Sequence, residues 1–423
     1  MNEILFKGIK VVSPSSSFNG QHVNLLIKDG VIAAITQEEV AAEHSIEASH
    51  LSVSEGWFDL RTKLTDPGFE HKDTIASISA SAVAGGFTDI AVLPNTKPAL
   101  QTKESVVYVK DMSRFLPVDF HVLAALTKDC KGEEMTEMTD LHHAGAVAFT
   151  DGVNSNWHMG VLKRALLYAQ GFDGCIIDQP EEQTMTENGH MNEGISSTLM
   201  GTRGIPTLAE EIAVQRSLAI LAYTGGRLHL TNISSAKSVD LIKEAKAEGL
   251  QVTCDVSAAH LFFTDEDLAS FDTNLKVKPP FRGQTDRQRL WEGIQEGVID
   301  AISSNHVPQD EESKNLEFDL ADFGMLGLET AFAAIMSRKP EEVSTATVIE
   351  KLTTGPRGIL KQEATSIEEG AEAILTIFSE EEEWTVTRED IKSYSDNTAF
   401  VGKTLKGKPV GIINKGSVVL NVE

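Results

Sequence analysis

The chain has 423 residues, of which 41% are hydrophobic and 24% charged, and this is an ordinary globular composition that excludes disorder. Its length exceeds the roughly 250–300 residues at which a single core stops growing, so we expect one large domain and a smaller one. The 37 Lys and Arg residues against 63 Asp and Glu give a formal charge of −26. That charge repels phosphate backbones and anionic membranes, which argues against nucleic acid or a membrane as partner.

The cysteines and the N-terminus predict a reducing, cytoplasmic location. Cys130, Cys175 and Cys254 are odd in number and far apart, which favours neither a disulfide framework nor a thiolate zinc site. Residues 1–10 show a mixed strand pattern instead of a basic stretch followed by an apolar one, and no run of 18 apolar residues occurs. We therefore expect neither export nor membrane insertion.

Between residues 56 and 360, short β-rich runs alternate with amphipathic helical runs. Eight strands are predicted, at residues 57–64, 88–93, 119–126, 146–150, 174–177, 227–233, 251–256 and 300–304. Helices with 3.6-residue apolar spacing are predicted at 74–84, 157–170, 208–223, 236–247 and 286–296, and several end in glycine. Eight β-then-α units favour an α/β fold of the closed (β/α)8 TIM-barrel type. A doubly wound open sheet is the competing fold, but no glycine-rich dinucleotide loop follows any strand.

The two ends of the chain predict a second, discontinuous β domain. Short β-type runs at 4–12, 23–27, 31–35, 373–378 and 410–420 are separated by turns such as Asp29-Gly30 and Lys415-Gly416. Neither end has enough strands to bury a face alone, so we expect both to form one small β-sandwich-type domain from residues 1–54 and 361–423. The barrel would then occupy residues 55–360.

In such a barrel the active site lies at the C-terminal ends of the strands. The polar residues predicted at those positions are Asp59, Arg61, Lys63, Thr65, Asn95, Asp151, Asp178, Asn232, His260, Asn305 and His306. The acidic pair Glu181-Glu182 is expected to be a solvated helix start, since acidic residues suit that end of a helix dipole.

Five short motifs in the sequence together point to a known protein family. They read DPGFEHKD at 66–73, GGFT at 85–88 with PNT at 94–96, AFTDG at 148–152, KVKPPFR at 276–282 and GLET at 327–330. Together, in this order and spacing over nearly the whole chain, they resemble the successive signatures of dihydroorotase. The resemblance implies an amidohydrolase barrel flanked by a small β domain, and reversible hydrolysis of a cyclic amide in pyrimidine synthesis. That reaction needs zinc to polarise the amide and activate a water, and a carboxylate to move the proton.

The resemblance also indicates that the metal ligands are replaced. Arg61 and Lys63 stand where the family has a His-x-His pair, and neither cation is a usable zinc ligand. Asp178 and Asn232 stand where the family has two further histidine ligands, and Asn305 replaces the catalytic, metal-binding aspartate. The bridging carboxylate survives as Asp151. We therefore expect no bound metal and no catalytic residue.

The substrate contacts implied by the resemblance are also altered. The family's carboxylate-binding arginine corresponds to Thr65, the asparagine of an Asn-Pro-Pro segment to Lys278, and a His-His pair to Ala259-His260. Asn95, Lys278 and His260 are the expected remnants of a substrate site. We further hypothesise that Arg61 or Lys63 replaces the charge of the metals by pairing with Asp151 or Asp178, because a buried unpaired carboxylate is costly.

Three functions are compatible with these residues. The first is a catalytically inactive, dihydroorotase-like pseudoenzyme that serves as a structural or regulatory subunit, for which the resemblance implies aspartate carbamoyltransferase as partner and a homo-oligomeric state. The second is an active dihydroorotase or a hydantoinase- or allantoinase-type enzyme with a rebuilt zinc site. Its ligands would come from Asp151, Asp178, His229, His260 and His306. The third is a sensor that binds a pathway metabolite without turnover, using Asn95, Lys278, Arg282 and Arg61.

Overall fold

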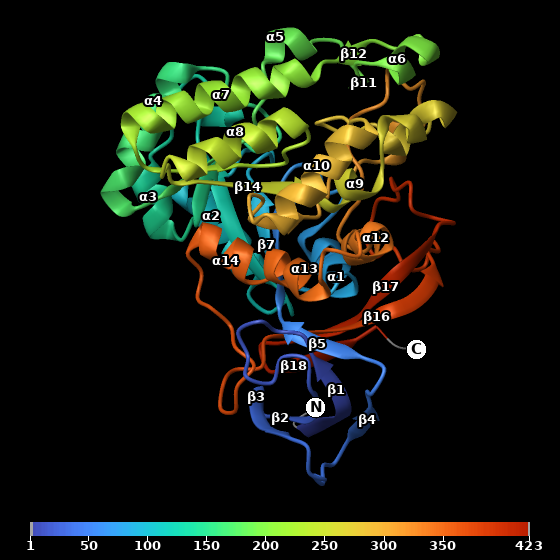
Figure 1. Ribbon diagram of the computed structural model, residues 1–423. Helices are drawn as coiled ribbons and strands as arrows, with labels where there is room; N and C mark the ends of the chain where they lie inside the picture. Colours follow the sequence, from blue (N-terminus) through green and yellow to red (C-terminus); the bar gives the residue numbers. More distant parts are fainter. Residues whose placement is uncertain (1–2, 422–423) are drawn as a thin grey trace.

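The structure, a computed structural model, describes residues 3–421 and places a barrel of parallel strands above a smaller sheet that contains the N-terminal strands (Figure 1). The barrel strands are β6 (Trp57–Lys63), β7 (Phe87–Leu93), β8 (Asp119–Ala125), β9 (Ala148–Thr150), β10 (Cys175–Asp178), β13 (Arg227–Leu230), β14 (Val252–Ser257) and β15 (Ala301–Ser303). They pair side by side in chain order, all in parallel. These are the eight strands predicted from the sequence.

Backbone hydrogen bonds beyond the last strand close the barrel. Lys63 N donates to His306 O at 2.8 Å, and His306 N donates to Arg61 O at 3.2 Å, which forms a parallel bridge between Thr62 and His306. The segment that follows β15 thus completes the ring onto β6. The prediction of a closed (β/α)8 barrel is confirmed, and the open doubly wound sheet is excluded.

Helices surround the barrel on its outer side (Figure 1). They are α1 (Ile75–Ala84), α2 (Lys103–Ser113), α3 (Met138–Ala144), α4 (Met159–Ala169), α7 (Thr207–Thr224), α8 (Ala236–Ala247), α9 (Ala258–Phe262), α10 (Gln284–Gln295), α11 (Glu311–Lys314), α12 (Ala331–Arg338), α13 (Thr345–Leu352) and α14 (Thr354–Leu360). Local chemistry sets several of the starts: the hydroxyls of Thr74 and Ser235 accept from backbone amides of the first turns of α1 and α8. The five predicted helices agree with α1, α4, α7, α8 and α10 to within two residues at each end.

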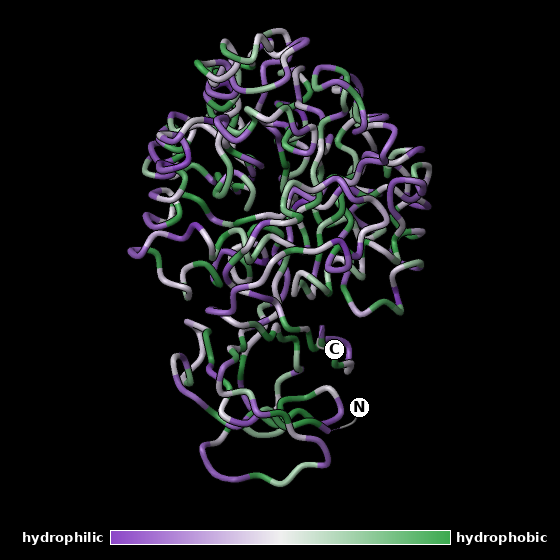
Figure 2. Tube along the Cα trace, turned by 90° about the vertical axis from the view of Figure 1, so that its right-hand side faces the viewer, coloured by the Kyte–Doolittle hydropathy of each residue, from purple (hydrophilic) through white to green (hydrophobic). Residues whose placement is uncertain are grey.

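Two apolar layers hold the barrel together. Residues that alternate along the strands fill the interior, for example Ala91, Leu123 and Ile177, while their neighbours Ile90, Val122 and Ile176 pack outward against the helices. Figure 2 shows hydrophobic segments running through the middle of the molecule and hydrophilic ones gathered on its outside. Ile359 and Leu360 of α14 join the interior layer.

The small sheet combines both ends of the chain. Its strand order is β18 (Ser417–Leu420), β17 (Thr404–Asn414), β16 (Leu375–Thr385), β5 (Ser52–Glu55), β1 (Glu3–Val11), β2 (His22–Lys28) and β3 (Val31–Thr36), with β4 (Ser45–Glu47) paired to β1. The antiparallel pairing of β5 with β16 joins the two flanks, which confirms a β domain built from both termini. The sequence analysis did not predict β4 or β5. The exact domain limits, 1–54 and 361–423 against 55–360, stay a prediction.

An aromatic cluster connects the barrel to this sheet. The ring of Trp57 at the start of β6 lies 4.6 Å from that of Phe332 in α12 and 5.3 Å from that of Phe378 in β16. All three rings are fully buried. Aromatic contacts at these separations bury large areas and fix the angle between the two parts.

An excursion between β10 and α7 rises above the barrel. It contains α5 (Gln183–Thr186), β11 (Met191–Asn192), α6 (Ile195–Met200) and β12 (Gly204–Ile205). Arg282 holds it down, because its guanidinium donates to Asn192 Oδ1 at 3.0 Å and to Ile205 O at 2.8 Å. Within residues 3–421, no helix is both long and apolar enough to cross a membrane.

We predict that Leu60→Ala, in the barrel interior, lowers the free energy of unfolding by about 2–5 kcal/mol, because it removes buried methyl groups and leaves a cavity. Leu60 is 4% exposed. The matched control is Leu199→Ala at an 83% exposed position of α6, where a change within about 0.5 kcal/mol is expected. Urea unfolding followed by tryptophan fluorescence measures both. Equal effects of the two variants would contradict the assigned interior.

Candidate functional site at the barrel mouth

A β-bulge in β6 directs Arg61 into the mouth of the barrel. Phe58 and Leu60 lie in the interior layer, so strict alternation would turn Arg61 outward. The pairing of β6 with β7 runs from Asp59–Ile90 to Thr62–Val92, so β6 advances three residues while β7 advances two. The extra residue is the mark of a bulge, which re-aims the side chain beside it.

The Arg61 guanidinium is bound by neutral groups from the ends of distant strands. Its Nε donates to Asn305 Oδ1 at 2.9 Å, while Nη2 donates to Gln179 Oε1 and, at 3.4 Å, to Gly152 O. The side chain is 1% exposed. Burial lowers the pKa of Arg61 to about 10, against the opposing attraction of Asp255 and Asp59, so the group is a cation at neutral pH.

Lys63 is a second cation in the same mouth. It lines the cavity with Arg61, and its ammonium forms neither a hydrogen bond nor an ion pair with any residue in the described range 3–421. Burial and the nearby charge of Lys72 lower the pKa of Lys63 to about 8, and the carboxylate of Asp322 opposes this shift. Lys63 is therefore mostly protonated at neutral pH, with little solvent around it.

The two carboxyls at the strand ends have their own hydrogen-bond donors. Asp151 accepts from the backbone amide and hydroxyl of Thr127 at 2.8 and 2.7 Å. Asp178 accepts from Ser217 Oγ at 2.9 Å and from Asn156 N at 3.3 Å. Burial raises the pKa of both carboxyls above the ordinary value. Neither carboxyl contacts Arg61 or Lys63, so the hypothesis that one of these cations pairs with Asp151 or Asp178 was wrong.

The two asparagines at the remaining strand ends have left-handed backbone conformations, with φ of 60° at Asn232 and 48° at Asn305. Asparagine tolerates this region better than most residues. The Asn232 amide donates to Lys278 O at 3.2 Å, and its Oδ1 has no partner among the described residues. Asn305 accepts from Arg61, so its carbonyl is already engaged.

Of the three expected substrate-binding remnants, only Lys278 faces open space. Asn95 donates to Asp151 O and accepts from Val153 N, which commits both ends of its amide to the backbone after β9. His260 is fixed between Ser257 Oγ at 2.6 Å and Pro279 O at 3.1 Å, and burial lowers its pKa to about 4. Their roles in binding stay predictions.

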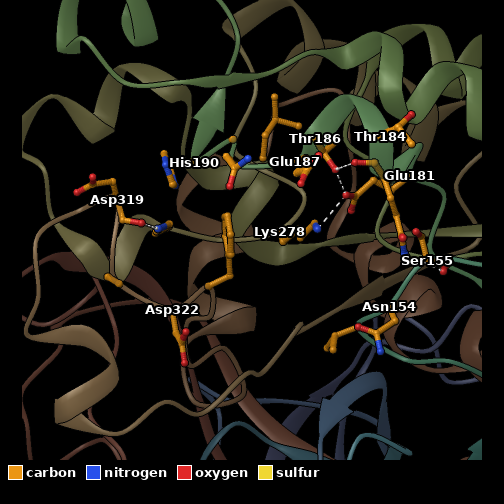
Figure 3. A pocket seen from close by; sticks show the side chains of 18 residues that line it. Asn154, Ser155, Glu181, Thr184, Thr186, Glu187, His190, Lys278, Asp319 and Asp322 are labelled. Atoms are coloured by element: carbon orange, nitrogen blue, oxygen red, sulfur yellow. Dashed lines mark hydrogen bonds and ion pairs between the residues drawn. The ribbon is translucent and has the colours of Figure 1, made fainter. Parts of the chain in front are cut away.

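Two connected cavities open above these residues. The inner one, of about 280 Å³, is lined by Arg61, Lys63, Lys278 and Asn305, among others, and the outer one, of about 630 Å³, lies beneath the excursion after β10. Lys278 lines both, and its ammonium lies 2.8 Å from Glu181 Oε1 (Figure 3). Glu181 was expected to be solvated, but it is 8% exposed, because this ion pair and the hydroxyl of Thr186 cover it.

Sequence reasoning missed several residues of the mouth. Gln179, Gln309, Asn154 and Phe323 line the inner cavity and were not among the candidates. Gln179 follows directly on Asp178 at the end of β10, so its place at a strand end was a usable signal. Gln309 and Phe323 come from long loops after β15, where no periodic pattern marks them.

The donor set does not fit a zinc site of the dihydroorotase type. Zinc in proteins binds imidazole, thiolate and carboxylate groups. Within residues 3–421, no three His, Cys, Asp or Glu side chains lie in an arrangement that could hold a metal ion. At the positions where the resemblance implies the other metal ligands, Asp151 and Asp178 are accompanied by two cations, Arg61 and Lys63, and two amides, Asn232 and Asn305. A metal there would lie beside the guanidinium of Arg61, which cannot release its proton.

Comparisons with known proteins first define the class. A family model described as "Amidohydrolase family" matches residues 185–419. The solved L-hydantoinase (dihydropyrimidinase) from Arthrobacter aurescens shares the fold with a TM-score of 0.85 at 24% identity, covering 100% of this chain and 98% of its own. The dihydropyrimidinase from Brevibacillus agri does so with a TM-score of 0.80 at 16% identity, covering 99% and 95%. The fold is that of the amidohydrolase barrels.

Sequence relatives then define the family. A model described as "Dihydro-orotase-like" matches residues 52–238. A dihydroorotase of Syntrophus aciditrophicus is 35% identical over 99% of this chain and 99% of its own, and one of Caldanaerobacter subterraneus is 37% identical over 95% and 94%. The chain belongs to the dihydroorotase family.

We predict that Lys63→Met stabilises the protein by up to about 3 kcal/mol at neutral pH, since each pKa unit of difference between folded and unfolded chains is worth 1.36 kcal/mol. The pKa of Lys63 is lowered from 10.5 to about 8 on folding, so the penalty is complete below pH 8 and disappears as pH rises toward 10.5. Denaturant unfolding at pH 7 and near pH 10 measures it. The exposed Lys237→Met is the control. An equal increase in the free energy of unfolding at both pH values, or a decrease at pH 7, would contradict the prediction.

Proposed function

We propose that this protein is a pseudoenzyme of the dihydroorotase family, without catalytic metals, that acts in pyrimidine biosynthesis as a structural or regulatory subunit. One observation carries this proposal. The guanidinium of Arg61 is hydrogen-bonded to Asn305, Gln179 and Gly152, so it lies between the ends of β6, β9, β10 and β15. A fixed cation thus takes up the space into which metal ligands from these strands would have to project.

The proton-transfer chemistry of the family is also unsupported. A general base must accept a proton near neutral pH, and the amide of Asn305 cannot do so. Of the strand-end carboxyls, Asp151 accepts hydrogen bonds from Thr127 and Asp178 accepts one from Ser217. These hydrogen bonds hold both strand-end carboxylates in place, and the remaining carboxylate of the inner cavity, Asp322, lies at its exposed rim.

The alternative is an active dihydroorotase or hydantoinase-type enzyme with a rebuilt zinc site. Its imidazoles would be those of His229, His260 and His306. His229 is bound to Asp255 at 2.8 Å and to Thr253, while His306 Nδ1 accepts from the amides of Gly327 and Leu328. His260 is held by Pro279, and His306 Nε2, which has no hydrogen-bond partner among the described residues, lies 3.7 Å from Asp73 Oδ2. These contacts favour the first proposal.

Aspartate carbamoyltransferase is the partner that we propose, on the basis of family membership. Family membership alone supports this partner, because large apolar side chains that are exposed singly are normal on protein surfaces and do not by themselves mark a contact. Phe115 is 89% exposed, Ile195 81% and Tyr223 77%. We propose a homo-oligomer on the same grounds.

The proposal predicts that the purified chain carries less than roughly a tenth of an equivalent of zinc and does not open dihydroorotate at high protein concentration. Elemental analysis and a ring-opening assay on the same sample measure this. Stoichiometric zinc with turnover would contradict it and support the rebuilt-site alternative.

A combined variant tests whether the replaced residues are the reason that the protein binds no zinc. Arg61→His, Lys63→His, Asp178→His, Asn232→His and Asn305→Asp together restore the donor types that the family uses, with Asp151 already present. We expect this variant to bind zinc, which elemental analysis detects independently of activity. The four-substitution variant that retains Arg61 is the matched control, and it should stay metal-poor. Equal zinc in both variants would show that Arg61 does not block the site.

We further predict that the chain co-elutes with aspartate carbamoyltransferase from the same cell in size-exclusion chromatography with light scattering. The mass of the chain alone in the same experiment gives its oligomeric state. Separate peaks at concentrations of about 10 μM would exclude a stable complex with a Kd in the low micromolar range.

A further inference from the structure

The inner cavity at the barrel mouth is strongly cationic for a protein of net negative charge. Three cations line it, Arg61, Lys63 and Lys278, against the single carboxylate of Asp322. Asp322 lies at the rim, where its side chain is 58% exposed and 3.6 Å from Lys72. The chain as a whole has a formal charge of −26. Positive charge is therefore concentrated in one enclosed place.

The protein itself leaves this charge largely uncompensated. Lys278 is paired with Glu181, but the hydrogen-bond acceptors of Arg61 are neutral, and Lys63 has none among the described residues. The Nη1 atom of Arg61 is buried without a hydrogen-bond partner. A buried donor that lacks a partner is expensive for a folded protein.

The carboxylates below the cavity are committed elsewhere. Asp255 accepts from His229, Thr231 and Ser303, at 2.8, 2.6 and 2.9 Å. Asp59 accepts from the backbone amide of Ser304 and the hydroxyl of Thr62. Their charges act on Arg61 only from a distance, without a direct ion pair. The open side of the cavity is thus the side from which an anion can approach.

We propose that the barrel mouth is a metal-free binding site for a small carboxylate, which Lys63 contacts directly and Arg61 stabilises from the cavity floor. This inference rests on the proposed function only in so far as the mouth must be free of metal. It assigns a binding role to the two residues that prevent the family's metal chemistry.

The lining limits the kind of carboxylate. A volume of about 280 Å³ is at the lower end for ligand pockets, which indicates a ligand smaller than a typical drug molecule. Among the described residues, the amide nitrogens of Gln179 and Asn305 and the Oδ1 atom of Asn154 have no hydrogen-bond partner, so the lining offers two donors and one acceptor to a hydroxyl or carbonyl group next to the carboxylate.

The outer cavity restricts the net charge of the ligand. Four carboxylates line it, against two lysines, of which Lys278 is paired with Glu181; the carboxylates are those of Glu181, Glu187, Asp319 and Asp322, and the second lysine is Lys276. A second negative group that reached outward would meet these carboxylates, and like charges repel at such distances. The site therefore favours a monoanion, such as a 2-hydroxy acid, over a dianion such as phosphate.

The stability penalty of Lys63 supports a binding role. The lowered pKa of this ammonium means that the folded protein would be more stable without it. Residues that reduce stability and lie in a cavity are typical of functional sites, because a ligand relieves the penalty only when it binds.

The test uses L-lactate as probe with the full-length, metal-free protein at about pH 7, with ionic strength held constant by potassium chloride. We expect about 50 mM lactate to raise the Tm of the wild type by about 2 °C. Lys63→Met should weaken binding by roughly tenfold or more, as measured by calorimetry, while Lys63→Arg, which keeps the charge, should stay within about threefold of wild type. Lys237→Met, on the exposed face of α8, should bind as the wild type does.

Several outcomes would overturn the proposal. The site is wrong if lactate gives no shift, or stabilises Lys63→Met as much as the wild type. Stabilisation by inorganic phosphate at least equal to that by lactate would overturn the assignment to a monocarboxylate. Metal content is measured on the same sample. Zinc in the protein would contradict the proposed loss of metals. A metal-free protein that does not bind lactate would contradict the carboxylate site alone.

Discussion

The guanidinium of Arg61, buried in the mouth of the barrel, is the constraint around which the other residues of this site are arranged. A desolvated cation must have acceptors, and Arg61 finds them on Asn305, Gln179 and Gly152, which lie at the ends of three other strands. Because two of these acceptors are side-chain amides and the third is a backbone carbonyl, none of them compensates the charge, and the Nη1 atom of Arg61 has no hydrogen-bond partner among the described residues. The positive field thus remains available to a ligand. In a zinc site, the same space would be surrounded by neutral imidazoles and carboxylates, which bind the metal in their deprotonated forms.

The carboxyls of Asp151 and Asp178 show how the barrel tolerates a buried cation at its mouth. Asp151 and Asp178 do not depend on the cation, since Thr127 and Ser217 supply their hydrogen bonds from neighbouring elements. Burial also raises the pKa of each carboxyl, which reduces the charge that has to be compensated. The scaffold of the dihydroorotase family can therefore keep the shape of the mouth with different side chains at its centre. A fold does not by itself fix an activity, because the activity depends on a few side chains.

The strands and main helices of the barrel were predictable because both follow local patterns. A buried strand such as β7 is a short apolar run, and an amphipathic helix such as α8 repeats its apolar residues every 3.6 positions. The excursion with β11 and β12 was not predicted, since strands of two residues carry no periodic signal. The strand β5 was missed for a related reason: its four residues are recognisable as a strand only through their pairing with β16, more than 300 positions later.

The sequence by itself determined the family, the closed barrel, the sheet formed from both ends, and the types of side chain at the strand ends. It did so because composition, periodicity and motif spacing are properties of the chain alone. The tertiary structure decided which of those side chains meet. Arg61 contacts Asn305, 244 residues away, and not Asp151 or Asp178, because an extra residue in β6 re-aims it. Glu181 is buried against Lys278 because the excursion folds over the mouth. Such contacts depend on distances between remote segments, which only the packed fold defines.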